Sequence, residues 1–318
     1  MRVLITGGAG RLGITVCKTL LHNGFQVRVF DLDTARNRKS IKELGEQAEI
    51  LWGDITQPNS VRQAIEEVDT VIHMAAILPP VAYQQPELAQ KVNVGGTRVI
   101  VDTIKEKGDR IPLIYTSSVA VFGPSPNATK PISPDKNKPH PKGAYAETKI
   151  QAENLLKEAG IDHVILRLTA TMYLSFEVSD LKRMFTVPLN NRIEYCHPDD
   201  TAMAILNAVK NFDTVKGNTL VISGGAEQRM LYQDMIRAIL GVMGLPLPPA
   251  HKFTREPYYL DWYDTSKSQE LLKFQQKTFA DYLEDYSREL TRKYSPLFLP
   301  FMRCFVGPVL GKLIVQLF

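Results

Sequence analysis

The sequence predicts an α/β fold in which helices cover both faces of a doubly wound parallel sheet. Strand-like apolar runs alternate with helix-like segments through the first half of the chain, and a glycine-rich turn joins the first run to the first helical pattern. With 318 residues, of which 44% are hydrophobic, the chain can bury a substantial core. This length allows one large domain or two closely associated ones.

Six strands are expected before residue 170, each a short run rich in β-branched, aliphatic or aromatic residues. They comprise residues 2–6, 26–31, 48–54, 70–76, 113–118 and 163–169. Between the first two strands, Leu12, Val16 and Leu20 recur on one face of a helix. This helix ends at Gly24, a residue suited to a left-handed cap. The chain therefore opens with a strand, a glycine turn, a helix and a second strand.

The second half of the chain is less regular. Helices are expected near residues 199–211, 230–243 and 265–291, and a strand over 218–223. Residues 123–143 contain six prolines and no periodicity, which predicts a long loop. Loops of that length inside a compact domain are usually functional.

Composition and charge argue against several classes of protein. The formal net charge is +4 with both signs mixed, so no nucleic-acid-binding surface is expected. Cys17, Cys196 and Cys304 lie far apart without Cys-X-X-Cys spacing, so neither a disulfide framework nor a metal site is expected. A reducing, cytoplasmic location fits this cysteine usage best. The first apolar run ends after five residues, which predicts a strand and not a signal peptide.

Gly7, Gly10 and Gly13 stand between the first strand and the first helix. Gly7 allows a tight turn, Gly10 lets the backbone approach a pyrophosphate, and Gly13 lets the helix pack close to the strand. The N-terminus of the helix favours the negative charge. Asp31 ends the second strand about twenty residues later, where a carboxylate accepts hydrogen bonds from ribose hydroxyls. Together these residues predict a dinucleotide-binding Rossmann fold.

Asp31 also favours NAD over NADP, because a carboxylate at this position repels a 2′-phosphate. Arg36 and Arg38 lie just beyond it and leave NADP open, since arginines can neutralise such a phosphate; otherwise they belong to a solvated loop. Asp54 closes the third strand. It is placed to reach the adenine edge, to cap the following helix, or to do both.

Tyr145 and Lys149 are four residues apart, so on a helix they share one face. A nearby ammonium group lowers the pKa of a phenol, ordinarily about 10, by favouring the phenolate. Ser118, or its neighbour Ser117, ends the fifth strand at the carboxyl edge of the sheet, where ligands bind in such folds. Taken alone, Tyr145 and Lys149 would also suit an ordinary amphipathic helix. Taken alone, the serine would also suit the cap of a strand. Together, Ser118, Tyr145 and Lys149 are the candidate catalytic set.

The segments TGGAGRLG, VFD, GDIT, HMAA, VNVGGT, SSVAVFG and YAETK occur in this order. With them the chain resembles the extended short-chain dehydrogenase/reductases, the NAD-dependent epimerase/dehydratase group, from residue 1 to about residue 225. The resemblance implies hydride transfer, with Tyr145 as general acid/base, Ser118 polarising the substrate oxygen, and Asn93 as a structural or supporting polar residue. The implied cofactor contacts are Gly7, Gly10, Arg11, Leu12, Gly13, Asp31, Asp54, Ile55, Ala75, Ala76, Tyr145 and Lys149.

Departures from that family pattern narrow the reaction. Val119 and Ala120 follow the candidate serine where sugar-nucleotide dehydratases carry an Asp-Glu pair, so a dehydratase is disfavoured. Residues 196–205 resemble a segment of the sugar-nucleotide epimerases. In those enzymes an arginine lies four residues before the histidine of this segment. That position is Ile193 here, although the adjacent Arg192 could substitute for it. The epimerase interpretation is therefore weakened but stays open.

These observations divide the chain into three parts. Residues 1–169 form the dinucleotide-binding domain, residues 170–294 a small substrate-binding region from which about 193–225 returns to the core, and residues 295–318 an apolar tail. Prolines, arginine and lysine interrupt the tail, so it does not suit a membrane span. Packing within the protein or in a dimer is favoured over peripheral membrane contact or cover for an apolar substrate. The family resemblance implies a homodimer.

The expected function is that of a cytoplasmic NAD-dependent oxidoreductase acting on a secondary alcohol or carbonyl compound. Its partner is then a small-molecule substrate. One alternative is a sugar-nucleotide epimerase with tightly bound NAD. The other is a non-catalytic NAD-binding regulator, which the Ser118, Tyr145 and Lys149 set argues against, because a sensor needs no phenolate.

Overall fold

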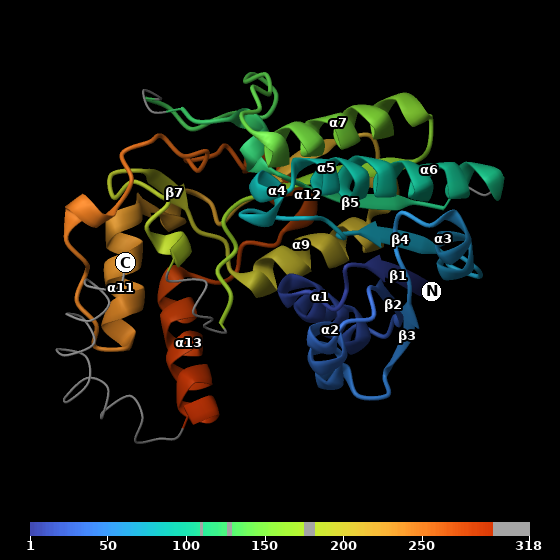
Figure 1. The fold of residues 1–318 in the computed structure, drawn as a ribbon, viewed down its shortest axis with the longest axis horizontal. Helices are drawn as coiled ribbons and strands as arrows, with labels where there is room; N and C mark the ends of the chain where they lie inside the picture. Colours follow the sequence, from blue (N-terminus) through green and yellow to red (C-terminus); the bar gives the residue numbers. More distant parts are fainter. Residues whose placement is uncertain (109–110, 126–128, 175–181, 295–318) are drawn as a thin grey trace.

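The computed structural model describes residues 1–108, 111–125, 129–174 and 182–294. Seven strands form one parallel sheet in the order β3-β2-β1-β4-β5-β6-β8, with helices on both faces (Figure 1). The strands are β1 Arg2–Thr6, β2 Gln26–Asp31, β3 Ala48–Trp52, β4 Thr70–His73, β5 Leu113–Ser118, β6 His163–Leu168 and β8 Thr219–Ile222. The doubly wound α/β fold is therefore confirmed. The strand order reverses between β1 and β4, which is where ligands bind in such sheets.

Alternating residues of β1 enter two different apolar clusters, one on each face of the sheet. Val3 and Ile5 pack with the helices α1 Arg11–His22 and α9 Pro198–Lys210. Leu4 packs instead with the helices of the opposite face, which are α3 Pro58–Ala64, α6 Thr97–Glu106 and α7 Ala144–Ala159. Because both faces are covered, the strands are nearly continuous hydrophobic runs.

Shorter elements complete this part of the chain. They are α2 Ala35–Ser40, η1 Ile41–Leu44, α4 Val81–Gln84, α5 Pro86–Ala89, η2 Gln90–Gly96, η3 Val119–Phe122, α10 Phe212–Val215 and η4 Ala226–Gln228. Of these, η2 is a π-helix that joins α5 to α6. Single-turn π segments within helices are frequent at functional sites.

A third apolar cluster lies apart from the sheet and packs around two helices, α11 Tyr232–Val242 and α13 Phe279–Tyr294 (Figure 1). Beside them the strands β7 Arg192–Glu194 and β9 Arg229–Leu231 pair antiparallel. The remaining elements are η5 Ala250–Lys252 and α12 Ser266–Leu272. This cluster provides the walls of a large cavity described below.

The single helix expected over residues 265–291 is wrong. The structure has two helices, α12 and α13, because Lys273 adopts a left-handed conformation with φ of 46° and ends α12. The apolar tail, residues 295–318, lies outside the described residues. Within the described part of the chain, no helix combines the length and the apolar character that crossing a membrane requires.

Candidate active site

One cleft at the carboxyl edge of the sheet is lined by every residue expected to bind the cofactor or to take part in catalysis. The cleft has a volume of about 540 Å³. The predicted residues in its lining are Gly7, Gly10, Arg11, Leu12, Gly13, Asp31, Asp54, Ile55, Ala75, Ala76, Ser118, Tyr145 and Lys149. The fold thus brings together residues that are far apart in the sequence.

The glycine loop leaves no room for side chains where backbone segments meet. Gly7 has φ of +73°, and a Cβ there would lie 2.8 Å from the backbone nitrogen of Ala75. A Cβ at Gly13 would lie 2.5 Å from the carbonyl oxygen of Gly7. Gly10 is the N-cap of α1, and no side chain in the described part of the chain caps this end. The first N–H groups of α1 are therefore available to an anion such as a pyrophosphate.

Asp31 is fixed next to this loop by three donors. Its Oδ2 accepts a hydrogen bond from the backbone N–H of Ala9 at 3.0 Å. Its Oδ1 accepts from the Leu32 N–H at 2.8 Å and from Asn37 Nδ2 at 3.1 Å. Burial raises the pKa of Asp31, and the hydrogen bonds from the Leu32 and Ala9 backbone act in the opposite direction.

Arg38 and Asp54, the charged residues that the sequence places near the cofactor, each have a partner of their own. Arg38 donates to the carboxylate of Asp33 and lies over the Trp52 ring, 5.7 Å from its centroid. Asp54 Oδ1 accepts from the N–H and hydroxyl of Thr56 at 2.8 and 2.9 Å. The expectation that Asp54 caps the next helix is wrong, because the N-cap of α3 is Gln57.

Ser118, at the end of β5, and Tyr145, in the first turn of α7, lie together in the lining of the cleft. Burial raises the pKa of Tyr145, and its interaction with the Ser118 side chain opposes this. The hydroxyl of Ser117 donates instead to Oε1 of Glu153 at 2.6 Å, and Glu153 is a buried residue of α7. Of the two candidate serines, Ser118 is therefore the one whose hydroxyl lies near the phenol.

Lys149 lies one turn after Tyr145 and is almost fully buried. Its Nζ donates to the carbonyl oxygen of Thr116 at 2.9 Å and lies 4.9 Å from the centroid of the Tyr115 ring. Burial lowers the pKa of Lys149 to about 8, while the negative charge of Glu153 raises it. The ammonium group is thus anchored to β5, and its expected effect on the pKa of Tyr145 stays a prediction.

Asn93, in the π-helix, supports the position of Tyr145. Its Oδ1 accepts from the N–H of Ile77 at 2.7 Å, and its Nδ2 donates to Thr148 Oγ1 at 3.0 Å. Thr148 in turn donates to the carbonyl oxygen of Tyr145 at 2.8 Å. The segment after β4 and the start of α7 are therefore held in one arrangement.

His73, which the sequence interpretation missed, continues this network to the glycine loop. Thr97 donates its hydroxyl proton to the Asn93 carbonyl at 2.6 Å, so it accepts from His73 Nε2 at 2.9 Å. His73 Nδ1 must then accept from Thr6 Oγ1, 2.7 Å away. Burial lowers the pKa of His73 to about 3, so the ring is neutral at physiological pH. Thr6 also accepts from the N–H of Ala75 at 3.2 Å.

A second cavity of about 650 Å³ adjoins the cleft and is mainly apolar. It lies among α11, α13 and the segments around residues 172 and 258, and its lining includes Met172, Met184, Met235, Ile236, Ile239, Met243, Tyr282 and Tyr286. Arg11, Tyr173, Arg183, Tyr258 and Tyr259 line both the cleft and the cavity. The sequence interpretation missed most of these residues, for which the adjacent tyrosines of EPYYLDWYD (256–264) were the only available signal.

Comparison with known proteins places this geometry in a family. The model of the 3-beta hydroxysteroid dehydrogenase/isomerase family matches residues 4–173, which include the glycine loop and the Ser118, Tyr145 and Lys149 set. The chain belongs to this family. The predicted resemblance to extended short-chain dehydrogenase/reductases is thereby confirmed.

Curated relatives from this comparison include named dehydrogenases. An uncharacterized protein of Sinorhizobium fredii is 33% identical over 251 residues, covering 74% of this chain and 59% of that protein. D-erythronate dehydrogenase of Cupriavidus necator is 31% identical over 183 residues, covering 53% and 54%. 3 beta-hydroxysteroid dehydrogenase type 7 of Rattus norvegicus is 33% identical over 162 residues, covering 49% and 48%. The chain thus matches about half to three-fifths of the length of these relatives.

Solved structures with the same fold include ligand complexes. A short-chain dehydrogenase/reductase superfamily protein from Agrobacterium tumefaciens with bound NAD has a TM-score of 0.76 at 21% identity, over 92% of this chain and 98% of that chain. UDP-glucuronic acid 4-epimerase from Bacillus cereus, in complex with UDP-glucuronic acid and NAD, has a TM-score of 0.78 at 20% identity, over 92% and 100%. At this identity the likeness establishes the fold.

Arg192, the residue that could substitute for the arginine of the epimerases, pairs with an acidic residue outside the cleft. Arg192 Nε lies 2.7 Å from Asp261 Oδ1, and its guanidinium lies 4.2 Å from the centroid of the Trp262 ring. Arg192 lines neither the cleft nor the cavity, whereas its neighbour Ile193 lines the cavity. The cavity wall at this point is therefore apolar.

Among the described residues, His197, Asp199 and Asp285 lie close enough together to hold a metal ion. However, His197 Nδ1 accepts a hydrogen bond from the Asp199 N–H at 3.1 Å. In the neutral ring Nε2 then carries the proton, and it faces Asp285 Oδ2 at 3.5 Å. Neither ring nitrogen has a lone pair to offer, so His197 acts as the N-cap of α9.

Proposed function

We propose that the chain is an NAD-dependent oxidoreductase that moves a hydride between NAD and a secondary alcohol or carbonyl carbon of an apolar small molecule. The observation that carries this proposal is the position of Tyr145. It lines the cofactor cleft with Ser118 and Lys149, and it belongs to the apolar cluster against which Tyr259 packs, a residue that lines both the cleft and the apolar cavity. A substrate in the cavity can therefore present its reacting carbon at this phenol.

The cleft fits NAD on three grounds. The glycine loop excludes side chains at Gly7 and Gly13, and the first turn of α1 offers N–H groups to phosphates. Asp31 is held beside this loop, where its carboxylate suits a ribose diol and disfavours a 2′-phosphate. When bound, NAD supplies the hydride acceptor or donor. Related folds crystallised with NAD support the same assignment.

The residues of the chain supply proton transfer and positioning. Tyr145 takes the proton from the substrate hydroxyl, or returns it to a carbonyl oxygen, while Ser118 donates a hydrogen bond to that oxygen. Burial raises the pKa of Tyr145. In this proposal the positive charge of Lys149, one turn further along α7, opposes that rise and favours the phenolate when substrate and cofactor are bound.

The lining of the cavity favours a substrate with a large apolar body. Its volume of about 650 Å³ lies within the range of small-molecule sites. Methionine and aliphatic side chains of α11 form much of the wall, and flexible methionines adapt to irregular apolar shapes. Relatives named as hydroxysteroid dehydrogenases support a hydroxysteroid-like compound as the first substrate to test.

NADH formation by the purified protein tests the proposal. With NAD and a panel of hydroxysteroids, absorbance at the NADH band should rise. The Tyr145→Phe variant should lose at least about a hundredfold in kcat and keep its affinity for NAD. Tyr195→Phe is the matched control, since the buried Tyr195 hydroxyl lines neither cavity and has no hydrogen-bond partner in the described part of the chain. Full turnover by Tyr145→Phe would refute the assigned role.

A sugar-nucleotide epimerase with tightly bound NAD is the second candidate, since epimerases share the fold. It is less well supported because Arg192 binds Asp261 and because the cavity wall at Ile193 is apolar. Retention of NAD through purification, with epimer formation and no net NADH, would favour it. A non-catalytic NAD-binding regulator would bind NAD and give neither product.

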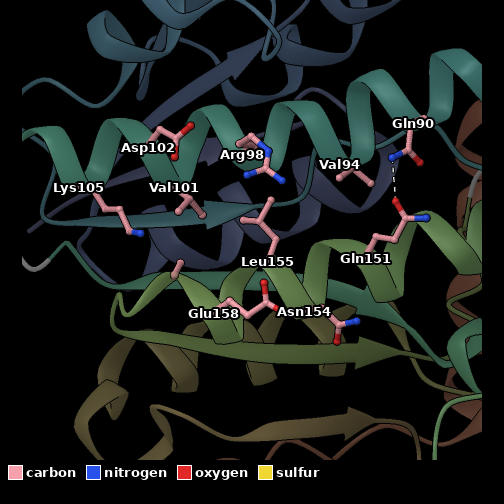
Figure 2. Close-up of a pocket in the computed structure, with 11 residues that line it drawn as sticks. Gln90, Val94, Arg98, Val101, Asp102, Lys105, Gln151, Asn154, Leu155 and Glu158 are labelled. Carbon is pink, nitrogen blue, oxygen red and sulfur yellow. Dashed lines mark hydrogen bonds between the residues drawn. The ribbon is translucent and has the colours of Figure 1, made fainter.

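We also propose that the protein is a homodimer, as the family resemblance implies. A groove of about 510 Å³ runs between α7 and the η2–α6 helix; Figure 2 shows Arg98, Asp102 and Lys105 on the α6 side and Asn154 and Glu158 on the α7 side. Charges of both signs on one surface are self-complementary, which suits pairing about a two-fold axis. Light scattering should give the mass of a dimer for the wild type and of a monomer for Arg98→Glu. The cytoplasmic location stays a prediction.

A further inference from the structure

Residues 258–264, called the wall segment below, carry side chains into the proposed active site. Tyr258, Tyr259 and Leu260, at its start, line both the cofactor cleft and the apolar cavity. The wall segment belongs to none of the helices and strands of the described structure, so regular backbone pairing does not hold it in place. Its position therefore depends on contacts from other parts of the chain.

One buried ion pair binds both the N–H and the carbonyl group of Tyr263. Glu194, on β7, has a fully buried side chain, and its Oε2 accepts from Arg229 Nε and from the Tyr263 N–H, each at 2.9 Å. Arg229, on β9, donates from Nη2 to the Tyr263 carbonyl oxygen at 2.6 Å. Glu194 Oε1 accepts from the Gly225 N–H at 3.0 Å. Each of these partners of the carboxylate is a donor, so the position requires a side chain that only accepts.

The Tyr263 side chain passes this constraint on to Tyr259. Its ring is fully buried, and its hydroxyl donates to the carbonyl oxygen of Tyr259 at 3.2 Å. Asn191, which precedes β7, donates from Nδ2 to the Leu260 carbonyl oxygen at 2.9 Å. The β7 region thus holds the backbone of two residues that line both the cleft and the cavity.

The proline-rich loop, residues 123–143, contacts the wall segment as well. The hydroxyl of Ser125 donates to Asp261 Oδ2, and the N–H of Ile132 donates to the Trp262 carbonyl oxygen at 2.8 Å. The wall segment is therefore held between this loop and the strands β7 and β9.

The side chains that hold Tyr263 do not themselves reach the substrate. Among the described residues, those that line the cleft or the cavity include neither Glu194 nor Arg229. Ile193 precedes Glu194 on β7, so it faces the opposite side of the strand, and it lines the cavity. Glu194 can therefore affect a substrate only through the residues that it holds.

We propose that Glu194 is a positioning residue for substrate recognition. Through the backbone of Tyr263 it fixes the place at which the wall segment meets the substrate. The inference rests on the proposed function, because it takes the cavity to hold the apolar body of an alcohol that reacts at Tyr145. A large apolar body contacts the wall segment, whereas a small alcohol leaves most of the cavity empty. Loss of Glu194 should therefore weaken the binding of a large substrate more than that of a small one.

Two alcohols of different size test this inference with the full chain. Androstanol and cyclohexanol each carry one secondary hydroxyl on a six-membered ring, but only androstanol extends along the cavity. In Glu194→Gln the amide nitrogen meets only donors, so the wall segment should shift. We expect kcat/KM with NAD to fall at least about tenfold for androstanol, through KM, and less than about twofold for cyclohexanol.

A binding measurement makes the test independent of turnover. Calorimetry follows androstanol binding to the complex with NADH, in which an alcohol cannot transfer hydride. In Glu194→Gln the affinity for androstanol should fall at least about tenfold, while the affinity for NADH changes less than about twofold.

A second variant and two controls separate positioning from loss of stability. Tyr263→Phe keeps the ring and removes only the hydroxyl that binds the Tyr259 carbonyl, so it should weaken androstanol binding about threefold even if Glu194→Gln fails to fold. Tyr195→Phe removes a buried hydroxyl that lines neither space and should leave both alcohols unaffected. Glu153→Gln breaks another buried acid–arginine pair, and any effect on turnover should be alike for the two alcohols. Thermal unfolding of each variant shows whether the fold is retained.

Three outcomes would overturn the inference. They are equal losses for the two alcohols in Glu194→Gln, a loss of NADH affinity as large as that of androstanol affinity, and unchanged androstanol binding in folded Glu194→Gln and Tyr263→Phe. Failure of the proposed function has a different signature. Neither alcohol would then yield NADH, whereas the calorimetric loss of androstanol affinity in Glu194→Gln would persist.

Discussion

Replacement of Glu153 by Gln is expected to weaken both the fold and the proposed active site. Glu153 lies on α7, one turn after Lys149, and its side chain is fully buried. Its Oε1 accepts from Ser117 Oγ at 2.6 Å and from Arg167 Nε at 2.9 Å, and its Oε2 accepts from Arg167 Nη2 at 2.7 Å. One carboxylate thus joins α7 and β5, the elements that carry the candidate catalytic residues, to each other and to β6.

The cost follows from the burial of this ion pair. Burial alone would raise the pKa of Glu153, but the hydrogen bonds and charge of Arg167, with Ser117, outweigh it and the pKa is lowered. Removing one partner of a buried pair leaves the other charge uncompensated, which costs about 3–5 kcal/mol. Lys157, 3.5 Å away and half-exposed, offsets little of this loss. Glu153→Gln keeps one acceptor oxygen, so we expect a loss of about 3 kcal/mol.

A double-mutant cycle with urea denaturation measures this effect. Arg167→Met removes the guanidinium, and the double variant Glu153→Gln/Arg167→Met leaves no unpaired charge. Its loss of unfolding free energy should be smaller than the sum of the single losses by about 2 kcal/mol. Additive losses would refute the argument, because they would mean that the two side chains do not act as a pair.

The same variant should change the dependence of activity on pH. The charge of Glu153 raises the pKa of Lys149, which burial lowers to about 8. Without that charge Lys149 loses its proton at a lower pH, so the alkaline limb of kcat/KM should move downward. Glu153→Asp keeps the charge and should leave this limb in place. An unchanged limb in Glu153→Gln would separate Glu153 from the electrostatics of the site.

Three further predictions concern single residues. Because the pKa of buried Lys149 is about 8, below its ordinary 10.5, the folded protein releases this proton first, and the free energy of unfolding without cofactor should rise between those pH values. Urea titrations should show this rise, at most about 3 kcal/mol, in the wild type and not in Lys149→Met. Asp31→Ala should weaken NAD binding about tenfold or more and NADP binding less, as fluorescence titration would show; equal losses would contradict the assigned cofactor preference. Gly13→Ala places a Cβ 2.5 Å from Gly7 O and should lower the melting temperature, whereas Gly241→Ala, with open space around it in α11, should preserve or raise it.

The glycine loop and its acid could be predicted from the sequence because their chemistry is local. Gly7 needs a positive φ and Gly13 needs contact with the loop backbone, so few residue types fit at either position. Asp31 ends a strand whose length is visible as an apolar run. In such places the backbone geometry and the side-chain requirement arise from the same short segment.

The rest of the site depends on contacts between distant segments. Tyr259 packs against the apolar cluster of Tyr145 from more than a hundred residues away, and no periodicity in its segment predicts this. The buried His73 network likewise joins threonines of β1 and α6, which as isolated residues look like ordinary strand and helix positions. The break between α12 and α13 was missed because Lys273 takes a left-handed conformation that sequence seldom signals outside glycine and asparagine.

The charges along the cleft give the proposed cofactor one direction. Asp31 and Asp54, at the end of β2 and just after β3, suit the hydroxyls and ring edge of an adenosine, whereas Lys149 lies against β5, where it donates to the Thr116 carbonyl. Phosphates on the loop between these ends would place the other half of the dinucleotide next to Tyr145. The reacting carbon then has to approach from the cavity, whose walls come mostly from residues 170–290. Cofactor choice and substrate choice are therefore separable, the first set by the glycine-loop half of the chain and the second by the half that the sequence predicts least well.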